Sequence, residues 1–413
     1  MKKYLLLAIP LLFGKPNAEA QFTVYNQLNS SLPKSSIFDI AAEGGGNIWM
    51  ALGSNGLAKF DGTTFTVYDT TKSSIGTSLV TSVAVSGSTT WMGSVSNGIA
   101  KLKDGTFTKY NTSNSLLPSN LVLCIAAEGD NLWVGTAISG LARFDGTNWT
   151  IYSSTKGNFE SLTIFSIFAK SSTEVWAATN NGLAKFDGST WEFFTTSNST
   201  IPANGILDVA KDSNGNIWIA TPMGLAKFDG SNGSAFTVFK KANSNIPSDG
   251  VNKVAVDASN NIWITTSGLT KFDGSDKWVT YTATNSDLPG NSIRHICVDG
   301  PKIWLGTDAG LAVAVASDLT SIKENNEKLA PSTSFPNPCN DGTTLSFEVP
   351  QDGKVLVSVY DLPGKEVASL INENFTKGKQ QLILDTKNYP QGTYFYKISG
   401  NGFSSVNKIS VVH

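Results

Sequence analysis

Tryptophan recurs through most of this 413-residue chain at a nearly constant interval. Around each one the same segments return, clearest where Asn131-Leu-Trp-Val-Gly-Thr136 is followed by Gly140-Leu-Ala-Arg-Phe-Asp-Gly146 and Trp149-Thr-Ile-Tyr152. An interval of 41 to 45 residues is the length of one four-stranded blade of a β-propeller. The pattern therefore predicts seven blades, marked by Trp49, Trp91, Trp133, Trp176, Trp218, Trp263 and Trp304.

The two ends of the repeat array predict how the ring closes. We name the four strands of a blade a to d in chain order; the last repeat ends near Ala316 without a d strand. Phe22-Thr-Val-Tyr25 matches d strands such as Phe65-Thr-Val-Tyr68 and supplies the missing one. We expect this N-terminal strand to complete the last blade, because closure removes unpaired inner edges. Deletion of residues 21–28 is then expected to destabilise the whole propeller.

Composition agrees with an all-β fold and narrows the choice of partners. Thirty-eight glycines and many Ser, Thr and Asn residues alternate with β-branched and aromatic residues, which favours short strands and tight turns. Charged residues make up 15% of the chain, the formal net charge is −2, and no stripe of Lys or Arg is present. We therefore expect no nucleic-acid partner.

The N-terminus has the pattern of a secretory signal. Lys2 and Lys3 precede an apolar stretch that is too short to span a bilayer, and Ala18-Glu19-Ala20 is a typical cleavage site. We predict a signal peptide at residues 1–20, cleavage between Ala20 and Gln21, and no integral membrane segment in the mature chain. The alternative is a short membrane anchor.

A second, smaller domain is predicted after the propeller at residues 21–316. Residues 317–332 are polar and read as a linker. Alternating apolar residues in 333–413 predict a small β-sandwich. The predicted strands are Leu345 to Val349, Lys354 to Tyr360, Gln381 to Asp385, Thr393 to Ile398 and Val406 to Val412.

Both parts resemble known families. Trp-x-Gly-Thr followed by Gly-Leu-x-x-Phe-Asp-Gly resembles the two-component-regulator propeller repeat, and implies its scaffold but not signalling. Phe335-Pro-Asn-Pro338, Val359-Tyr-Asp-Leu-Pro-Gly364, Gly392-Thr-Tyr-Phe-Tyr396 and Lys408-Ile-Ser-Val-Val412 resemble, in order, the type A sorting domain of the type IX secretion system.

The second resemblance implies a route and a partner. It implies a Bacteroidota-type bacterium, export through the periplasm, and contact between the C-terminal domain and the type IX secretion machinery. The expected location is secreted or outer cell surface, and the family usually loses this domain on export. The alternative is an ordinary adhesion sandwich that stays attached.

Aligned a strands predict a ring of side chains at the channel mouth. One position holds, blade by blade, Asp39, Ser82, Cys124, Ser166, Asp208, Lys253 and His295, and the position before it includes Asn252 and Arg294. Asp39, Asp208, Asn252, Lys253, Arg294 and His295 therefore form a candidate ligand patch. The alternative is a channel wall that is merely hydrated by water.

Residues for catalysis or for metal binding do not gather in the sequence. The three cysteines are scattered, the only histidines are His295 and His413, and no nucleophile motif or phosphate-binding loop occurs. We therefore expect no cofactor, no metal site and no enzyme activity, but a binding protein whose ligand is a glycan or a protein. The alternative is an extracellular polysaccharide-acting enzyme that uses Asp39 and Asp208.

Overall fold

The structure is a computed structural model and carries side chains. It describes residues 22–33, 36–77, 79–129, 131–156, 159–231, 233–319, 328–329, 332–349, 352–362, 366–400 and 403–413. The predicted signal peptide and its cleavage site at Ala20 and Gln21 lie outside these residues. Within the described chain, no helix has the length and apolar character that a bilayer span requires.

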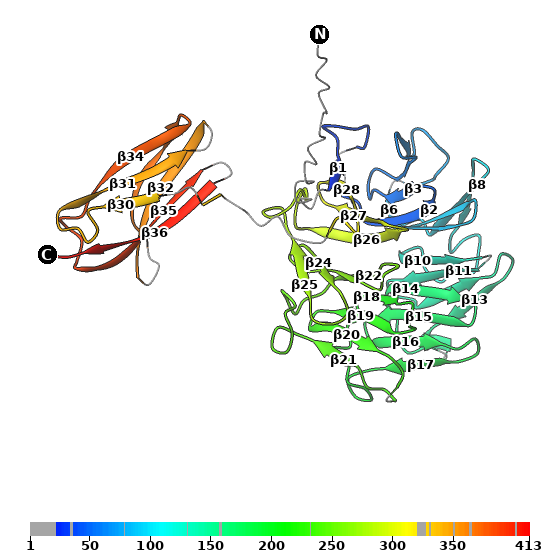
Figure 1. The fold of residues 1–413 in the computed structure, drawn as a ribbon. Helices are drawn as coiled ribbons and strands as arrows, with labels where there is room; N and C mark the ends of the chain where they lie inside the picture. Colours follow the sequence, from blue (N-terminus) through cyan, green and yellow to red (C-terminus); the bar gives the residue numbers. More distant parts are fainter. Residues whose placement is uncertain are drawn as a thin grey trace, which may run out of the picture. The chain divides into compact units, whose positions relative to one another are not determined.

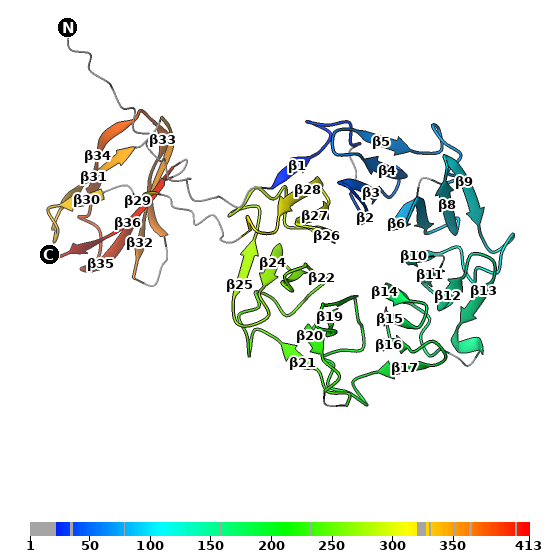
Figure 2. The ribbon, with the colours of Figure 1, turned by 45° about the vertical axis from the view of Figure 1, so that its right-hand side comes forward.

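The described part of the first unit folds into seven four-stranded antiparallel sheets, which follow one another around a ring (Figure 2). The all-β class and the propeller architecture are confirmed. Blade 1 contains β2 (Asp39–Gly44), β3 (Asn47–Ala51), β4 (Leu57–Phe60) and β5 (Phe65–Tyr68); blade 2 contains β6 (Val80–Ser86), β7 (Thr89–Ser94), β8 (Ile99–Lys103) and β9 (Thr106–Tyr110); blade 3 contains β10 (Val122–Glu128), β11 (Asn131–Thr136), β12 (Leu141–Phe144) and β13 (Trp149–Tyr152).

The other blades repeat this order of a, b, c and d strands after a single 3-10 turn, η1 (Ser154–Lys156). Blade 4 contains β14 (Ile164–Ser171), β15 (Glu174–Thr179), β16 (Gly182–Phe186) and β17 (Trp191–Phe194); blade 5 contains β18 (Asp208–Lys211), β19 (Ile217–Thr221), β20 (Gly224–Phe228) and β21 (Thr237–Phe239); blade 6 contains β22 (Lys253–Val256), β23 (Ile262–Thr265), β24 (Leu269–Phe272) and β25 (Trp278–Tyr281).

The N-terminal strand closes the ring as predicted. Blade 7 consists of β26 (Ile293–Asp299), β27 (Lys302–Thr307) and β28 (Gly310–Val315), and its fourth strand is β1 (Thr23–Tyr25). β1 pairs antiparallel with β28, with Thr23 opposite Val313 (Figure 2). Phe22 is 5% exposed and lies edge-on to Tyr281 at 6.2 Å between ring centroids. The last blade is thus built from both ends of the propeller sequence.

The repeated tryptophans form the core between blades. All seven are buried, and most of them contact an aromatic ring of the next blade. Trp304 of blade 7 lies 6.0 Å from Phe60 of blade 1, and Trp133 of blade 3 lies 5.6 Å from Phe186 of blade 4. Large rings fill the wedge between twisted sheets, so the tryptophans hold the blades together rather than presenting a sugar-stacking surface.

Aspartates in the c–d turns are used by the turns themselves. Asp61 accepts hydrogen bonds from the backbone N–H groups of Thr63 and Thr64, and Asp187 does the same for Ser189 and Thr190. These bonds lower the pKa of Asp61 and of Asp187 far below the usual range, led by the backbone bond from Thr64 and from Thr190 respectively. The sequence Phe-Asp-Gly is therefore a turn signal.

The second unit, Lys323–His413, has its own core. One sheet has five strands, β29 (Lys328–Leu329), β36 (Phe403–Val411), β35 (Gly392–Gly400), β32 (Gly353–Asp361) and β33 (Glu366–Phe375); the other has three, β30 (Ser332–Phe335), β31 (Gly342–Val349) and β34 (Gly378–Asp385) (Figure 1). Buried residues from both sheets, such as Phe347, Val357 and Tyr396, share one apolar cluster, so the unit is a β-sandwich.

Two details add to the sequence analysis. Within the residues expected as a linker, Leu319 is fully buried in the propeller, and strands β29 and β30 pair within the sheets of the second unit. Strand β33 was not predicted, because its residues are mostly exposed on both faces and show weak alternation. Its place at a sheet edge explains that exposure.

Candidate functional site

The a strands line the centre of the ring, and the aligned positions sit on them (Figure 2). Four of the six predicted binding residues form two side-chain pairs there. His295 Nε2 lies 3.0 Å from Asp39 Oδ1, and Lys253 Nζ lies 3.9 Å from Asp208 Oδ1. Each pair joins neighbouring blades: blade 7 to blade 1, and blade 5 to blade 6.

The two carboxylates also hold the backbone of the next blade. Asp39 Oδ2 accepts a hydrogen bond of 2.9 Å from the N–H of Val83, and Asp208 Oδ2 accepts one of 2.9 Å from the N–H of Val254. Asp208 is 7% exposed. Each carboxylate therefore links its own blade to the next one.

Cys124 belongs to the same ring of positions. Burial raises the pKa of its thiol well above the usual range, and the charges of Lys253, Asp39 and Asp208 add smaller effects of mixed sign. Its thiol donates to the carbonyl of Ile164 on the next blade at 3.5 Å. This cysteine is therefore a neutral packing residue rather than a nucleophile.

Arg294 and Asn252 lie one residue before the ring and are exposed. Arg294 stacks over the ring of Phe38 at 4.8 Å and forms an ion pair with Asp308. Ser292 donates a second hydrogen bond to Asp308. The bond from Ser292, followed by that from Arg294, lowers the pKa of Asp308 to about 2. The backbone N–H of Asn252 donates to the carbonyl of Thr265 at 3.0 Å, and no ion pair or side-chain hydrogen bond joins Asn252 to this group among the described residues.

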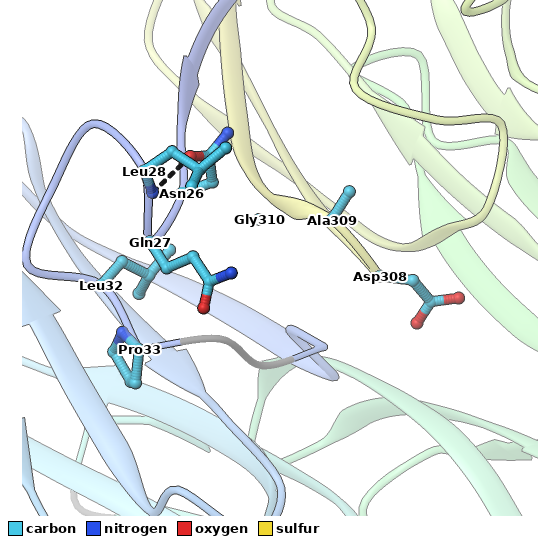
Figure 3. A pocket seen from close by; sticks show the side chains of 8 residues that line it. All are labelled: Asn26, Gln27, Leu28, Leu32, Pro33, Asp308, Ala309 and Gly310. Carbon is cyan, nitrogen blue, oxygen red and sulfur yellow. Dashed lines mark hydrogen bonds between the residues drawn. The ribbon is translucent and has the colours of Figure 1, made fainter.

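Asp308 of this cluster also lines a pocket of about 340 Å³, which lies beside the place where β1 pairs with β28 and closes the ring (Figure 3). The loop after β1 forms one wall and the turn between β27 and β28 forms the other. Gln27 and Asp308 lie on opposite sides of the space (Figure 3). The lining residues are Asn26, Gln27, Leu28, Leu32, Pro33, Asp308, Ala309 and Gly310.

Sequence reasoning missed Asp308 and this pocket. The b–c turns of the seven repeats contain one acidic residue, which is Asp308, while the other positions carry Leu, Gly, Ser, Asn, Ala, Ile, Pro, Met, Val or Thr. Alignment of these turns would have singled it out. We name the cluster of Phe38, Arg294, Ser292 and Asp308 with its pocket the seam site.

Several d–a loops are fixed by their own asparagines. In the loop after β9, the Oδ1 atom of Asn114 accepts the backbone N–H of Asn111, and its Nδ2 atom donates to the carbonyl of Lys109. Asn198 and Asn285 make the same pair of bonds in other loops. These amides are therefore not available to a ligand.

Exposed apolar side chains lie at the end of the propeller that carries the d–a loops. In an antiparallel blade the d–a and b–c loops lie at one end of the strands, and the a–b and c–d loops at the other. Every exposed large apolar residue among the described propeller residues lies in or beside a d–a or b–c loop. They are Leu28, Phe38, Leu79, Leu116, Ile138, Leu162 and Met223. We name this end the d–a face.

The described residues contain no group of three or more His, Cys, Asp or Glu side chains placed to hold a metal ion. The geometry thus defines a class: a β-propeller with a polar seam site and an apolar d–a face, joined to a β-sandwich. Residues 333–412 of that sandwich match the secretion system C-terminal sorting domain, and residues 200–223 match the two component regulator propeller. Both resemblances are confirmed, and the chain carries a type IX sorting domain.

Solved structures share the fold at low identity. PorZ of Porphyromonas gingivalis, described as an essential bacterial surface component of the type-IX secretion system, has 17% identity and a TM-score of 0.59, covering 93% of this chain and 60% of that one. This chain therefore spans less than two thirds of PorZ. Virginiamycin B lyase from Staphylococcus aureus has 17% identity and a TM-score of 0.56, covering 71% and 98%. No curated protein matches the sequence.

Proposed function

We propose that this chain is exported by the type IX secretion system and binds a glycan or a protein partner through the d–a face of its propeller, without catalysing a reaction. The sorting domain supports the export. The route through the periplasm, removal of the sorting domain, and release or surface attachment belong to the same proposal. The secretion machinery is the partner of the C-terminal unit.

The observation that carries the binding role is the one-sided placement of exposed apolar side chains. Leu28 is 88% exposed, Leu116 68% and Ile138 64%, and all three are on the d–a face. Exposed apolar groups that gather on one face of a soluble domain favour a bound partner. The opposite end instead carries the c–d turn aspartates, such as Asp61 and Asp187, which suit contact with water.

The seam site supplies the polar part of such an interface. Arg294 and Phe38 present a cation stacked on an aromatic ring, a combination that is frequent among residues dominating binding energy. Asp308 and Gln27 add an acceptor and an amide beside Leu28. A ligand that spans pocket and apolar surface would meet both kinds of contact.

Thermal-shift measurements of the full chain against a panel of oligosaccharides, with products analysed in the same wells, test this proposal. A ligand at about a hundred times its dissociation constant stabilises the folded state by about 2.7 kcal/mol. Phe38→Ser combined with Leu116→Ser is expected to abolish the shift. Thr63→Ser, on the opposite end, is the control and is expected to keep it.

The outcomes separate the functions. A shift without products supports a glycan-binding propeller, and products in the wells would replace it by the enzyme alternative. If no oligosaccharide shifts the midpoint, the glycan form of the proposal is abandoned, and the protein form is tested next with the same variants against outer-membrane surface proteins. Binding that is unchanged in the Phe38 and Leu116 double variant would exclude a contact through these two side chains.

A further inference from the structure

A second pocket, of about 490 Å³, lies on blade 4, away from the seam site. It is formed by the d–a loop that enters blade 4, the b–c turn of that blade, strand β17, and the d–a loop that leaves it. Its lining residues are Glu160, Asn181, Trp191, Phe193, Thr195, Ser197, Asn198 and Asn204. A pocket of this size is in the range that binds small ligands.

The loop that supplies Glu160 departs from the repeat. Six d–a loops carry Leu or Ile at a fixed position, and five of them follow it with proline; the sixth has glycine. Here the two positions are Phe159 and Glu160. The equivalent pairs are Leu32-Pro33, Ile75-Gly76, Leu117-Pro118, Ile201-Pro202, Ile246-Pro247 and Leu288-Pro289. The one acidic residue at this position thus coincides with a pocket.

Phe159 fixes the position of Glu160. Its side chain is 2% exposed and lies edge-on to two aromatic rings of strand β17, at 4.8 Å from Trp191 and 5.0 Å from Phe193. Both of those rings line the pocket. Glu160 follows directly in the chain, so the burial of Phe159 fixes the backbone that carries the exposed Glu160 side chain at the rim of the pocket.

A backbone hydrogen bond joins the two segments that form the other side of the pocket. The backbone N–H of Gly182 donates to the carbonyl of Asn204 at 2.7 Å, which holds the b–c turn against the loop that leaves the blade. This bond places Asn181 beside Asn204. In the same wall Asn198 already uses its amide for the loop, through Thr195 and Phe193.

Three polar side chains of this pocket have hydrogen-bond donors or acceptors that no other described residue uses. Within the described residues, the Glu160 carboxylate has no ion pair or hydrogen bond, the Asn181 side chain has none, and Asn204 uses only its Oδ1 atom, toward Thr196. One carboxylate and two amides offer acceptors and donors close together. Vicinal hydroxyl groups satisfy such a set, because each hydroxyl both donates and accepts.

We propose that the blade 4 pocket binds a neutral sugar unit, with the Glu160 carboxylate accepting hydrogen bonds from two adjacent hydroxyl groups. Asn181 and Asn204 contact further hydroxyl groups, and Trp191 and Phe193 form the apolar part of the wall beside the sugar ring. Charge-assisted bonds to a carboxylate are the strongest contacts available here. This site rests on the proposed function, because its loops belong to the d–a face, but it shares no lining residue with the seam site, so each site can fail without the other.

The test measures binding of maltose, cellobiose, lactose and diacetylchitobiose to the full chain by calorimetry, with spermidine as a cationic probe. We expect millimolar binding of at least one disaccharide. Glu160→Gln is expected to weaken it by about tenfold, which is about 1.4 kcal/mol. Glu160→Pro, which restores the residue of the other loops, is expected to abolish it.

Glu192→Gln is the matched control. It also removes one negative charge, from strand β17 between the pocket residues Trp191 and Phe193, but the Glu192 side chain does not line the pocket. Its affinity is expected to equal that of the unmodified chain. Failure of all four disaccharides at millimolar concentration, equal binding by Glu160→Gln, or Glu160-dependent binding of spermidine alone would each overturn the proposal. The Phe38 and Leu116 variants are expected to leave this binding unchanged.

Discussion

His295 of the last blade pairs with Asp39 of the first, Nε2 to Oδ1 at 3.0 Å, and Asp39 in turn accepts the backbone N–H of Val83 in the second. One carboxylate thus links three consecutive blades at the inner rim. Asp208 links blades 5 and 6 in the same way, through Lys253 and Val254. These residues were predicted as a ligand patch, and the geometry gives them a structural role as well.

The first prediction concerns this linkage. Asp39→Ala and Asp208→Ala leave a backbone N–H without its acceptor, and each is expected to lower the free energy of unfolding by about 1–3 kcal/mol. Ser166→Ala, at the equivalent position of blade 4, is the control and is expected to change it little. Urea denaturation followed by tryptophan fluorescence measures the difference. Unchanged midpoints in both aspartate variants would show that the links contribute nothing.

The second prediction concerns the closing strand. Phe22→Ala empties a site that is 5% exposed and packed against Tyr281, so it is expected to cost about 3–5 kcal/mol. Thr23→Ala, at an exposed neighbour on the same strand, is the control. Deletion of residues 21–28 is expected to lower the thermal midpoint of the whole propeller by more than either. A deletion variant that melts within a few degrees of the full chain would refute closure as a source of stability.

The third prediction is a titration. Because the folded pKa of Asp308 is about 2, below the unfolded value of about 3.9, its ionised form favours folding. That contribution is complete above the unfolded pKa and is lost as the pH falls through 2. Carbon NMR of the carboxyl group is expected to give this low midpoint. Ser292→Ala is expected to raise it, and Arg294→Ala to raise it less; a midpoint near 4 in the unmodified chain would contradict the hydrogen-bond geometry.

The fourth prediction concerns the cysteines. Burial raises the pKa of the Cys297 thiol to about 12 and raises that of the Cys124 thiol further. Cys339 is only 1% exposed. All three are free thiols. Only thiolates alkylate readily, so iodoacetamide at pH 8 is expected to leave the folded chain unlabelled and to modify three sites after unfolding. Rapid labelling of the folded chain at any of the three would show that the thiol is accessible.

Much of the fold could be predicted from local sequence, because each blade repeats the same strand pattern with a buried tryptophan at the same position. The tryptophan interval located the b strands, and the likeness between Phe22-Thr-Val-Tyr25 and the d strands predicted the pairing of β1 with β28. Strand β33 escaped because its exposed residues carry no alternating signal. The burial of Leu319 was not predicted, because it is a single apolar residue in a polar stretch and its burial depends on the tertiary structure.

The candidate site was less predictable. Alignment placed Asp39 and His295 at equivalent positions, but only the angle between blades 7 and 1 determines that their side chains meet. Arg294 was predicted from the alignment of the a strands, whereas its partner Asp308 lies in a b–c turn, which that alignment did not cover. The one-sided placement of Leu28, Leu116 and Ile138 requires knowledge of which turn residues are exposed. Such relationships join distant segments and leave no periodic trace.

The pairing of β1 with β28 also sets an order of events during synthesis. The ribosome makes Thr23 near the beginning and Val313 only after the rest of the propeller has been made. The first strand to emerge must therefore wait for the last, since loop closure between distant segments is slow. A nascent chain with an open ring has not yet gained the stability of the closed form, so the full stability of the propeller is reached only when its last blade has been made.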